Sequence, residues 1–263
     1  MSYLNLPPLD FASQRLKDKV IFVTGASSGI GAAAVRLFAR EGAQVVAAAR
    51  RRQKLEALSR ELEQQGFSVA CVECDVRGEA SVSEAIDFTV ARYGRLDGAF
   101  NNAGVHAPRL PIHEARVEDL DAVLTTNLRG VFLCLKHETA AMLKSGGGAI
   151  VNTSSIAGLI GAPGNSMYAA SKWGLSALTR CVALDYARSG IRVNAIAPGP
   201  TRSEMFDDWQ TTEDDRARLA DKFPMNYIAH PDDMARAALF LLSDEARWTT
   251  GITLPCEGGR SVA

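Results

Sequence analysis

The stretch Val20-Ile21-Phe22-Val23-Thr24-Gly25-Ala26-Ser27-Ser28-Gly29-Ile30-Gly31 decides the fold. Its first five residues are apolar or β-branched, which is typical of a short strand buried on both faces. Gly25, Gly29 and Gly31 then make a glycine-rich turn, and residues 30–40 continue with apolar side chains at helical spacing. A strand, a tight turn and a helix in this order predict the first half of a β-α-β unit.

The alternation of strand-like and helix-like segments continues along the chain. Five further apolar runs have the composition of buried strands: residues 44–49, 68–73, 96–100, 149–153 and 192–197. Segments with helical patterning lie between them. Strands that are apolar on both faces and alternate with helices predict a parallel sheet covered on both sides, and right-handed crossovers make it doubly wound. We therefore expect an α/β fold, a single Rossmann domain with about seven parallel strands and helices on both faces.

The composition excludes several classes of protein. Of 263 residues, 47% are hydrophobic and 22% charged, which favours a folded globular chain over a disordered one. The chain has 30 acids and 29 bases, and the net charge of −1 argues against a nucleic-acid partner or a polybasic membrane contact. No apolar run approaches the roughly 20 residues that span a membrane, and the start lacks a signal-peptide pattern. We expect a cytoplasmic protein.

Cysteine and histidine do not indicate a metal site or a disulfide framework. The chain has five cysteines, a small and odd number. Cys71 and Cys74 form a C-x-x-C at a predicted strand, but no second pair completes a zinc site. The four histidines show no ligand spacing. We therefore expect no bound metal.

The glycine turn and the end of the second predicted strand point to a dinucleotide. A helix that starts in such a turn presents free N–H groups and a partial positive charge to a pyrophosphate. NAD-binding units usually place an acid at the end of the second strand, to hold the ribose 2′-hydroxyl. Here Ala49 is followed by Arg50, Arg51 and Arg52. Because arginine suits a dianionic 2′-phosphate, we expect NADP(H) rather than NAD(H), with Arg50 as the leading contact and Arg51 and Ser27 as support.

Further motifs follow in a fixed order. They are Asp75-Val76, Asn101-Asn102-Ala103-Gly104, Asn127, Ser154-Ser155, Tyr168-Ala169-Ala170-Ser171-Lys172 and Pro198-Gly199. Together with the glycine turn, this set resembles the short-chain dehydrogenase/reductase family, in its branch of 3-oxoacyl carrier-protein reductases and sugar dehydrogenases. The resemblance runs over residues 19–259, which leaves residues 1–18 as an N-terminal extension before a domain of residues 19–263.

The resemblance implies a role for each motif. The family's catalytic tetrad maps onto Asn127, Ser155, Tyr168 and Lys172. The motifs after the predicted strands would border the adenine, the riboses and the nicotinamide. Including the turn and the arginines, the implied cofactor contacts are Gly25, Ser27, Ser28, Gly29, Ile30, Gly31, Arg50, Arg51, Asp75, Val76, Asn102, Ala103, Gly104, Tyr168, Lys172, Pro198, Gly199 and Thr201.

The tetrad has the chemistry that a carbonyl reduction needs. Tyr168 would act as general acid or base, although a free tyrosine has a pKa near 10, some 4 kcal/mol away from neutrality. Lys172 lies on the same face of a helix, and a cation about 4 Å away is worth roughly 4 kcal/mol, so we expect Lys172 to lower that pKa against the opposing desolvation. Ser155 would bind the substrate oxygen. By resemblance, Asn127 would hold a water that links Lys172 to solvent.

A polar insertion carrying aromatic residues, at about residues 200–230, is expected to form a lid over the substrate. Between Arg202 and Lys222 it holds seven acids and four bases, which suits an anionic acyl carrier poorly. Candidate pocket residues are His106, Ile156, Ala157, residues 159–164, Phe206 and Trp209. The lining would be mixed apolar and polar, for a small carbonyl or alcohol substrate.

Two other functions stay open at this point. An NAD-linked alcohol or polyol dehydrogenase would use the same fold and tetrad. A non-catalytic dinucleotide sensor would be expected to lack the tyrosine or the lysine, and Tyr168 and Lys172 are both present. By resemblance we also expect a homo-oligomer, a tetramer first and a dimer second, with subunit faces on the helices around residues 120–142 and 168–186. Trp173 is expected to be an interface or core residue.

Overall fold

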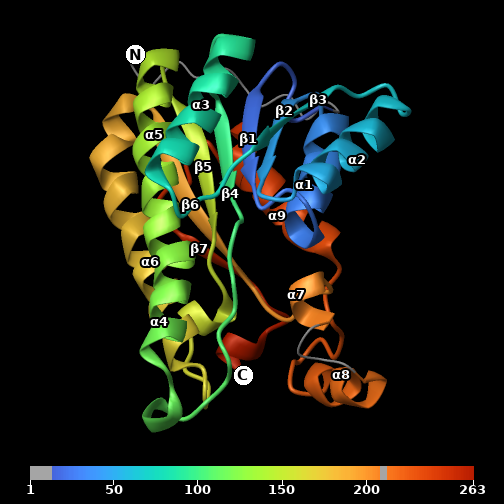
Figure 1. Ribbon diagram of the computed structural model, residues 1–263, viewed down its shortest axis with the longest axis vertical. Helices are drawn as coiled ribbons and strands as arrows, with labels where there is room; N and C mark the ends of the chain where they lie inside the picture. The colour runs from blue at the N-terminus through green and yellow to red at the C-terminus, as the bar shows by residue number, and fades with distance from the viewer. Residues whose placement is uncertain (1–13, 208–211) are drawn as a thin grey trace.

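Seven parallel strands form one continuous sheet in the computed structural model, which describes residues 14–207 and 212–263 (Figure 1). The order across the sheet is β3-β2-β1-β4-β5-β6-β7. The strands are β1 (Val20–Thr24), β2 (Gln44–Ala49), β3 (Val69–Glu73), β4 (Gly98–Asn101), β5 (Gly148–Thr153), β6 (Ile191–Pro198) and β7 (Thr253–Cys256). The chain winds outward from β1 in one direction and from β4 in the other. The expected doubly wound α/β fold is confirmed.

Helices cover both faces of the sheet, as Figure 1 shows. On one face lie α1 (Gly29–Arg40), α2 (Arg52–Glu63) and α9 (Pro231–Leu242). On the other lie α3 (Glu79–Tyr93), α5 (Gly130–Ser145) and α6 (Ser166–Tyr186), with α4 (Val117–Leu124) packed against α6. The alternation within β1 explains the two layers, because Ile21 and Val23 join the first core and Phe22 joins the second.

The first described residues pack against the domain. Leu16 is fully buried in the core that contains α1 and α9, and the Arg15 side chain forms an ion pair with Glu245 at 2.5 Å. Residues 1–13, the greater part of the expected extension, lie outside the described residues. The part from Gln14 to Asp18 therefore contributes to the same core as the sheet.

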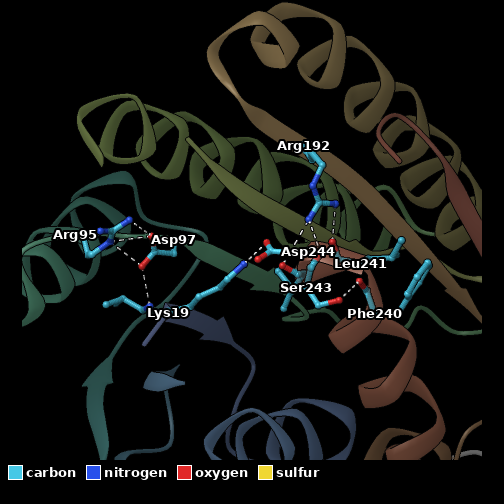
Figure 2. Close-up of polar contacts among 10 residues, drawn as sticks. Lys19, Arg95, Asp97, Arg192, Phe240, Leu241, Ser243 and Asp244 are labelled. Atoms are coloured by element: carbon cyan, nitrogen blue, oxygen red, sulfur yellow. Dashed lines mark hydrogen bonds and ion pairs between the residues drawn. The ribbon is translucent and has the colours of Figure 1, made fainter. Parts of the chain in front are cut away.

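Polar contacts fix the edge of the sheet where the strands begin (Figure 2). The Asp97 carboxylate accepts a hydrogen bond from the Val20 N–H at 2.9 Å and pairs with Arg95. The Arg192 guanidinium donates to the carbonyl oxygens of Leu241 and Ser243, at 2.8 and 3.0 Å, and so satisfies the end of α9. These contacts hold the edge opposite to the one where the strands end.

The carboxyl ends of the strands meet at the other edge. There, β1 and β4 are neighbours from which the chain diverges, a place that leaves a crevice in open α/β sheets. The segments that follow β1, β4, β5 and β6 carry most of the predicted site residues to this crevice. Among the described residues, none of the helices is both long and apolar enough to cross a membrane.

Candidate active site

A cleft of about 360 Å³ opens at the carboxyl ends of the strands. It has an outer end, defined here by Ser27, Ser28, Arg50, Arg51 and Asp75, and an inner end, defined by Ser155, Tyr168 and Lys172. Nearly all the predicted site residues line it: Gly25, Ser27, Ser28, Gly29, Ile30, Arg50, Arg51, Asp75, Val76, Asn102, Ala103, Gly104, Ser155, Tyr168, Lys172, Pro198, Gly199 and Thr201. Gly31 and Asn127 are not among the lining residues.

The glycine turn is shaped by close backbone contacts. Gly25 and Gly29 adopt positive φ angles of 66° and 53°, a conformation that L side chains rarely adopt. A Cβ on Gly31 would lie 2.2 Å from the carbonyl oxygen of Gly25. Gly31 therefore acts behind the cleft, where it lets α1 start directly against the turn. The Thr24 hydroxyl accepts hydrogen bonds from the Asn102 and Ala103 N–H groups, at 3.0 and 3.2 Å, and ties the turn to the end of β4.

The three consecutive arginines have different surroundings. Arg50 is exposed, lines the cleft, and makes no hydrogen bond or ion pair within residues 14–207 and 212–263. Arg51 lines the cleft with its guanidinium bound to Ser28 and Glu204, both at 2.6 Å. Arg52 lies outside the lining and pairs with Glu56 at 2.8 Å, one turn along α2. Arg50 is therefore the guanidinium at the outer end that has no such partner in the described part of the chain.

Asp75 completes the outer end. Its carboxylate binds the Arg77 guanidinium at 2.6 Å and accepts from the Arg77 N–H at 3.0 Å. These contacts, with a smaller contribution from Arg50, hold the pKa of Asp75 below its usual range. The motif Asp75-Val76 thus borders the cleft as a fixed, charged turn after β3.

The inner end brings three side chains together from two elements. Ser155 follows β5 and its hydroxyl accepts the Ala157 N–H at 3.1 Å. Tyr168 and Lys172 lie on α6, and the Ser155 and Tyr168 side chains are hydrogen-bonded. The Lys172 ammonium donates to the Thr153 carbonyl oxygen at 2.7 Å and lies 5.5 Å from the centre of the Tyr168 ring. The spacing of four residues places both side chains on one face, as predicted.

Burial dominates the protonation of this end. It raises the pKa of Tyr168 to about 12, although the Ser155 hydrogen bond and the Arg109 charge act in the lowering direction. It also lowers the pKa of Lys172 to about 8. The expectation that Lys172 brings the pKa of Tyr168 down is therefore wrong for the chain alone, because desolvation outweighs the favourable charges.

Asn127 lies in a π-helical turn, Thr125–Arg129, between α4 and α5. Its side chain is fully buried, and its Oδ1 and Nδ2 atoms bind the N–H and the carbonyl of Val105, both at 2.8 Å. Nδ2 also lies 3.3 Å from the Ser171 hydroxyl. Asn127 thus clamps the loop after β4 to α6 from behind the cleft. Single π turns within α-helices occur frequently at functional sites.

The substrate side of the cleft is only partly as predicted. His106, Ile156, Ala157 and Phe206 line it, and the His106 ring stacks on Tyr168 with centroids 4.6 Å apart. Residues 159–164 are absent from the lining, and Trp209 lies outside the described residues. Lining residues beyond the predicted ones include Arg109, Asn165, Glu204, Met205, Leu219 and Phe223.

The insertion after β6 supplies further apolar residues of this wall, Met205, Phe206, Leu219 and Phe223. It contains α7 (Glu204–Asp207) and α8 (Glu213–Ala220), and Thr201 pairs with Ala229 in a short parallel bridge at its base. Phe206 is buried, 3% exposed, between the insertion and the cleft. Within the described residues, no group of three or more histidine, cysteine or acidic side chains could hold a metal ion.

Comparisons with known proteins agree with this geometry. A family profile described as "Enoyl-(Acyl carrier protein) reductase" matches residues 25–261. The chain is 47% identical to the A-factor type gamma-butyrolactone 1'-reductase (1S-forming) of Streptomyces virginiae, over 94% of this chain and 97% of that one. It is 41% identical to the cis-4-hydroxycyclohexanecarboxylate dehydrogenase of Sinomonas cyclohexanicum, over 92% and 96%.

A solved structure shows the same architecture. The crystal structure of a levodione reductase matches with a TM-score of 0.90 and 35% identity, over 94% of this chain and 99% of that one. The relatives are oxidoreductases of alcohols and ketones, and their similarity spans nearly the whole chain. The chain therefore belongs to the short-chain dehydrogenase/reductase family and is an oxidoreductase that acts on CH–OH and C=O groups by hydride transfer.

Proposed function

We propose that this protein is an NADP(H)-dependent reductase of a small ring-bearing ketone, with Asn127, Ser155, Tyr168 and Lys172 as its catalytic tetrad. One observation carries the proposal: a single cleft joins the Ser155–Tyr168–Lys172 group, whose lysine is buried, to an exposed arginine at the opposite end. A cleft with these two groups at its opposite ends suits a dinucleotide, because the reactive ring and the 2′-phosphate lie at opposite ends of that molecule.

The shape and donors of the cleft fit a bound dinucleotide. The glycine turn leaves no room for side chains, since a Cβ on Gly25 would lie 2.9 Å from the Ala103 backbone. The first N–H groups of α1 therefore face the cleft without obstruction, as phosphate binding requires. The Lys172 ammonium uses one donor on Thr153 and retains two for ribose hydroxyls. When bound, the cofactor supplies or accepts the hydride.

Arg50 supports the preference for NADP(H). The outer end offers an exposed guanidinium that no described side chain pairs, and a 2′-phosphate is the dianion that such a group binds with two hydrogen bonds. Asp75, whose carboxylate feels the charge of Arg50, is already bound to Arg77. A 2′-hydroxyl would satisfy Arg50 less well, because it carries no charge.

Tyr168 supplies the proton in a reduction. Its pKa of about 12 keeps the hydroxyl protonated at neutral pH, ready to donate to the alkoxide oxygen that forms from the ketone. The Ser155 hydroxyl, hydrogen-bonded to Tyr168, would hold that same oxygen as charge develops on it. The Lys172 ammonium keeps positive charge beside the pair at a pH below about 8.

Asn127 would complete the proton path to solvent. A Cβ on Gly104 would lie 3.2 Å from Asn127 Oδ1 and 3.8 Å from Lys172 Nζ, so both groups border the same point of the backbone. Oδ1 retains one lone pair after its bond with Val105. A water held there would carry a proton from solvent to Lys172 and so replace the proton that Tyr168 gives up, and the amide would also fix the loop that borders the cleft.

The lining and the relatives favour a ring-bearing substrate. Apolar side chains of Ile156, Phe206 and Phe223 face the same cleft as the polar pair Ser155 and Tyr168. A lactone and a cyclohexane ring occur in the names of the relatives' substrates. The insertion that contributes Phe206 would act as a lid over such a ring.

We also propose a homo-oligomer, a tetramer first and a dimer as the alternative. Large apolar side chains are exposed on α5 and α6, where Phe132 is 51%, Trp173 53% and Leu184 79% exposed. Subunit contacts would bury these side chains, since large exposed apolar patches mark contacts between proteins. Sedimentation equilibrium of the full chain measures the mass, and a monomer at micromolar concentration would contradict the assembly.

The test of the activity is a steady-state assay with ring ketones. Cyclohexanone and its substituted derivatives are offered with NADPH and with NADH, and the absorbance of the reduced nicotinamide is followed. We expect ketone-dependent oxidation of NADPH with a kcat/KM at least tenfold above that with NADH. Turnover with NADH alone would favour an NAD-linked dehydrogenase, and dinucleotide binding without turnover of any ketone or alcohol would favour a sensor.

A further inference from the structure

Glu204 is an acid placed at the outer end of the cleft, from an element far along the chain. It begins α7, directly after the β6 segment, and it lines the cleft together with Ser28 and Arg51. One carboxylate oxygen binds the Arg51 guanidinium at 2.6 Å, and the other binds the Lys54 ammonium. A hydrogen bond with the Ser28 side chain adds a third partner.

These partners are the donors that a phosphate would use. Arg51 donates to the Ser27 and Ser28 hydroxyls at 2.9 and 2.6 Å, which orients the guanidinium and both hydroxyls around one point. Lys54 adds a second positive charge from the first turn of α2. Two cations bind the oxyanion, and the two hydroxyls bound to Arg51 lie beside it. Next to Arg50, these groups form an anion site. In this structure the anion is the protein's own carboxylate.

The ion pairs of Glu204 with Arg51 and Lys54 form readily, and another anion can replace the carboxylate in them. Together the two cations hold the pKa of Glu204 at about 2, so it is ionised at all working pH values. However, the side chains of Arg51, Lys54 and Glu204 are 45%, 46% and 49% exposed. Exposed pairs of this kind contribute little free energy, because water and salt screen them. A dianion that also binds Arg50 can therefore displace the carboxylate.

We propose that Glu204 is an intramolecular competitor for the 2′-phosphate of NADP(H) at the anion site formed by Ser27, Ser28, Arg51 and Lys54, and thereby sets how strongly the protein prefers NADP(H) over NAD(H). The proposal rests on the proposed use of a dinucleotide in this cleft. NAD(H) has no phosphate at that position, so Glu204 stays on Arg51 and Lys54 when NAD(H) binds. Binding of NADP(H) breaks both ion pairs.

The experiment compares dissociation constants of the wild-type protein, Glu204→Gln and Asp207→Asn. NADPH and NADH are titrated by nicotinamide fluorescence, and 2′,5′-ADP and 5′-AMP by calorimetry, which isolates the phosphate from the reacting ring. Asp207→Asn is the matched control, since it removes an equal charge one helical turn away, where Asp207 pairs with Arg216 at 2.9 Å. Thermal unfolding checks that both variants are folded, as expected for exposed side chains.

We expect Glu204→Gln to bind NADPH and 2′,5′-ADP about five- to tenfold more tightly than the wild type, with NADH and 5′-AMP within twofold. Asp207→Asn should stay within twofold for all four ligands. An unchanged NADPH affinity would overturn the proposal. So would weaker binding of both cofactors, which would mean that Glu204 closes the cleft over them, or equal tightening of both, which would mean a long-range charge effect.

The outcomes separate this proposal from the proposed function. Suppose that the wild type binds NADH more tightly than NADPH, and that Glu204→Gln reverses this order or reduces the ratio of the two affinities. The proposed NADP(H) preference is then wrong, and the proposed competition stands. If NADPH is preferred and Glu204→Gln leaves the ratio unchanged, the preference stands and the competition is wrong. If neither dinucleotide binds at millimolar concentration, both are wrong.

Discussion

The two ends of the cleft handle charge in opposite ways. At the outer end Arg51 and Glu204 are 45% and 49% exposed and paired with one another. At the inner end Lys172 is only 3% exposed, and burial brings its pKa down to about 8 while it raises that of Tyr168 to about 12. Electrostatics at the outer end are screened by water, whereas at the inner end desolvation decides which groups carry protons.

This difference assigns different tasks to the two ends. A screened site can distinguish two ligands by their charge at little cost to stability, because its ion pairs exchange readily. A desolvated site can hold a proton on a tyrosine at neutral pH and release it only when a stronger base forms beside it. Variants at the inner end should therefore change the rate, and variants at the outer end should change which cofactor binds.

The largest expected effect comes from removing the proton at the inner end. Tyr168→Phe deletes the hydroxyl and little contact area, so kcat for ketone reduction should fall by about 10³-fold, while the NADPH dissociation constant stays within threefold. Steady-state kinetics and fluorescence titration measure the two quantities. Ser155→Ala, which keeps the proton donor, is the comparison and should lose less. Near-normal turnover by Tyr168→Phe would refute its role as the acid.

The pH dependence should report the buried lysine. The pKa of Lys172 is lowered to about 8, so its positive charge is present below that pH and lost above it. Tyr168 stays protonated across the same range. We expect kcat/KM for NADPH in the reduction to fall by up to tenfold per pH unit above about pH 8.

A substitution at the outer end should not change the shape of that pH profile. In Arg50→Ala, kcat/KM for NADPH should be lower at every pH but should fall above pH 8 in the same way, since an arginine stays charged throughout the range. A profile that is flat to pH 10 would mean that the charge of Lys172 does not contribute to the reaction.

Arg50→Ala should change cofactor preference rather than rate. The lost hydrogen bonds to a phosphate are worth about 1.5 kcal/mol at an exposed position, so NADPH should bind roughly tenfold more weakly. Binding of NADH should remain within twofold, and kcat at saturating NADPH should be unchanged. Equal weakening of both cofactors would place Arg50 away from the ribose.

The smallest effect is expected from the third arginine of the run. Arg52 pairs with Glu56 on the exposed face of α2 and does not line the cleft. Arg52→Ala removes the same charge as Arg50→Ala, so it controls for net charge, and both dissociation constants should stay within twofold. A loss of NADPH affinity as large as that of Arg50→Ala would mean that the three consecutive arginines attract the cofactor through their summed charge rather than through a specific contact.

The sequence predicts most of the strands well, including β3 at one edge, and fails at β7, the strand at the other edge. Buried runs such as residues 44–49 match β2 residue for residue, because both faces of an inner strand must be apolar. The strand β7 was not located from its sequence, Thr-Leu-Pro-Cys, since a proline argues against a strand except at a sheet edge, where β7 lies. Leu96 belongs to an apolar run but is buried just before β4 rather than within it.

The site was predictable where a motif carries it. Residues without a motif, such as Arg109 and Leu219, come to the cleft from loops whose paths depend on the whole fold. The π-helical turn that turns Asn127 towards Val105 also has no sequence signal, since residues 120–142 show an ordinary amphipathic pattern. The direction in which the pKa of Tyr168 is shifted depends on how deeply the side chain is desolvated, and the spacing of residues in the sequence does not reveal this.

The most direct test of the account is a titration of the purified wild-type protein with NADPH and NADH side by side, followed by nicotinamide fluorescence. An outer end that recognises the 2′-phosphate predicts binding of NADPH at least tenfold tighter than that of NADH. Equal binding, or tighter binding of NADH, would contradict the assignment of Arg50 and direct the search for substrates towards alcohols and polyols.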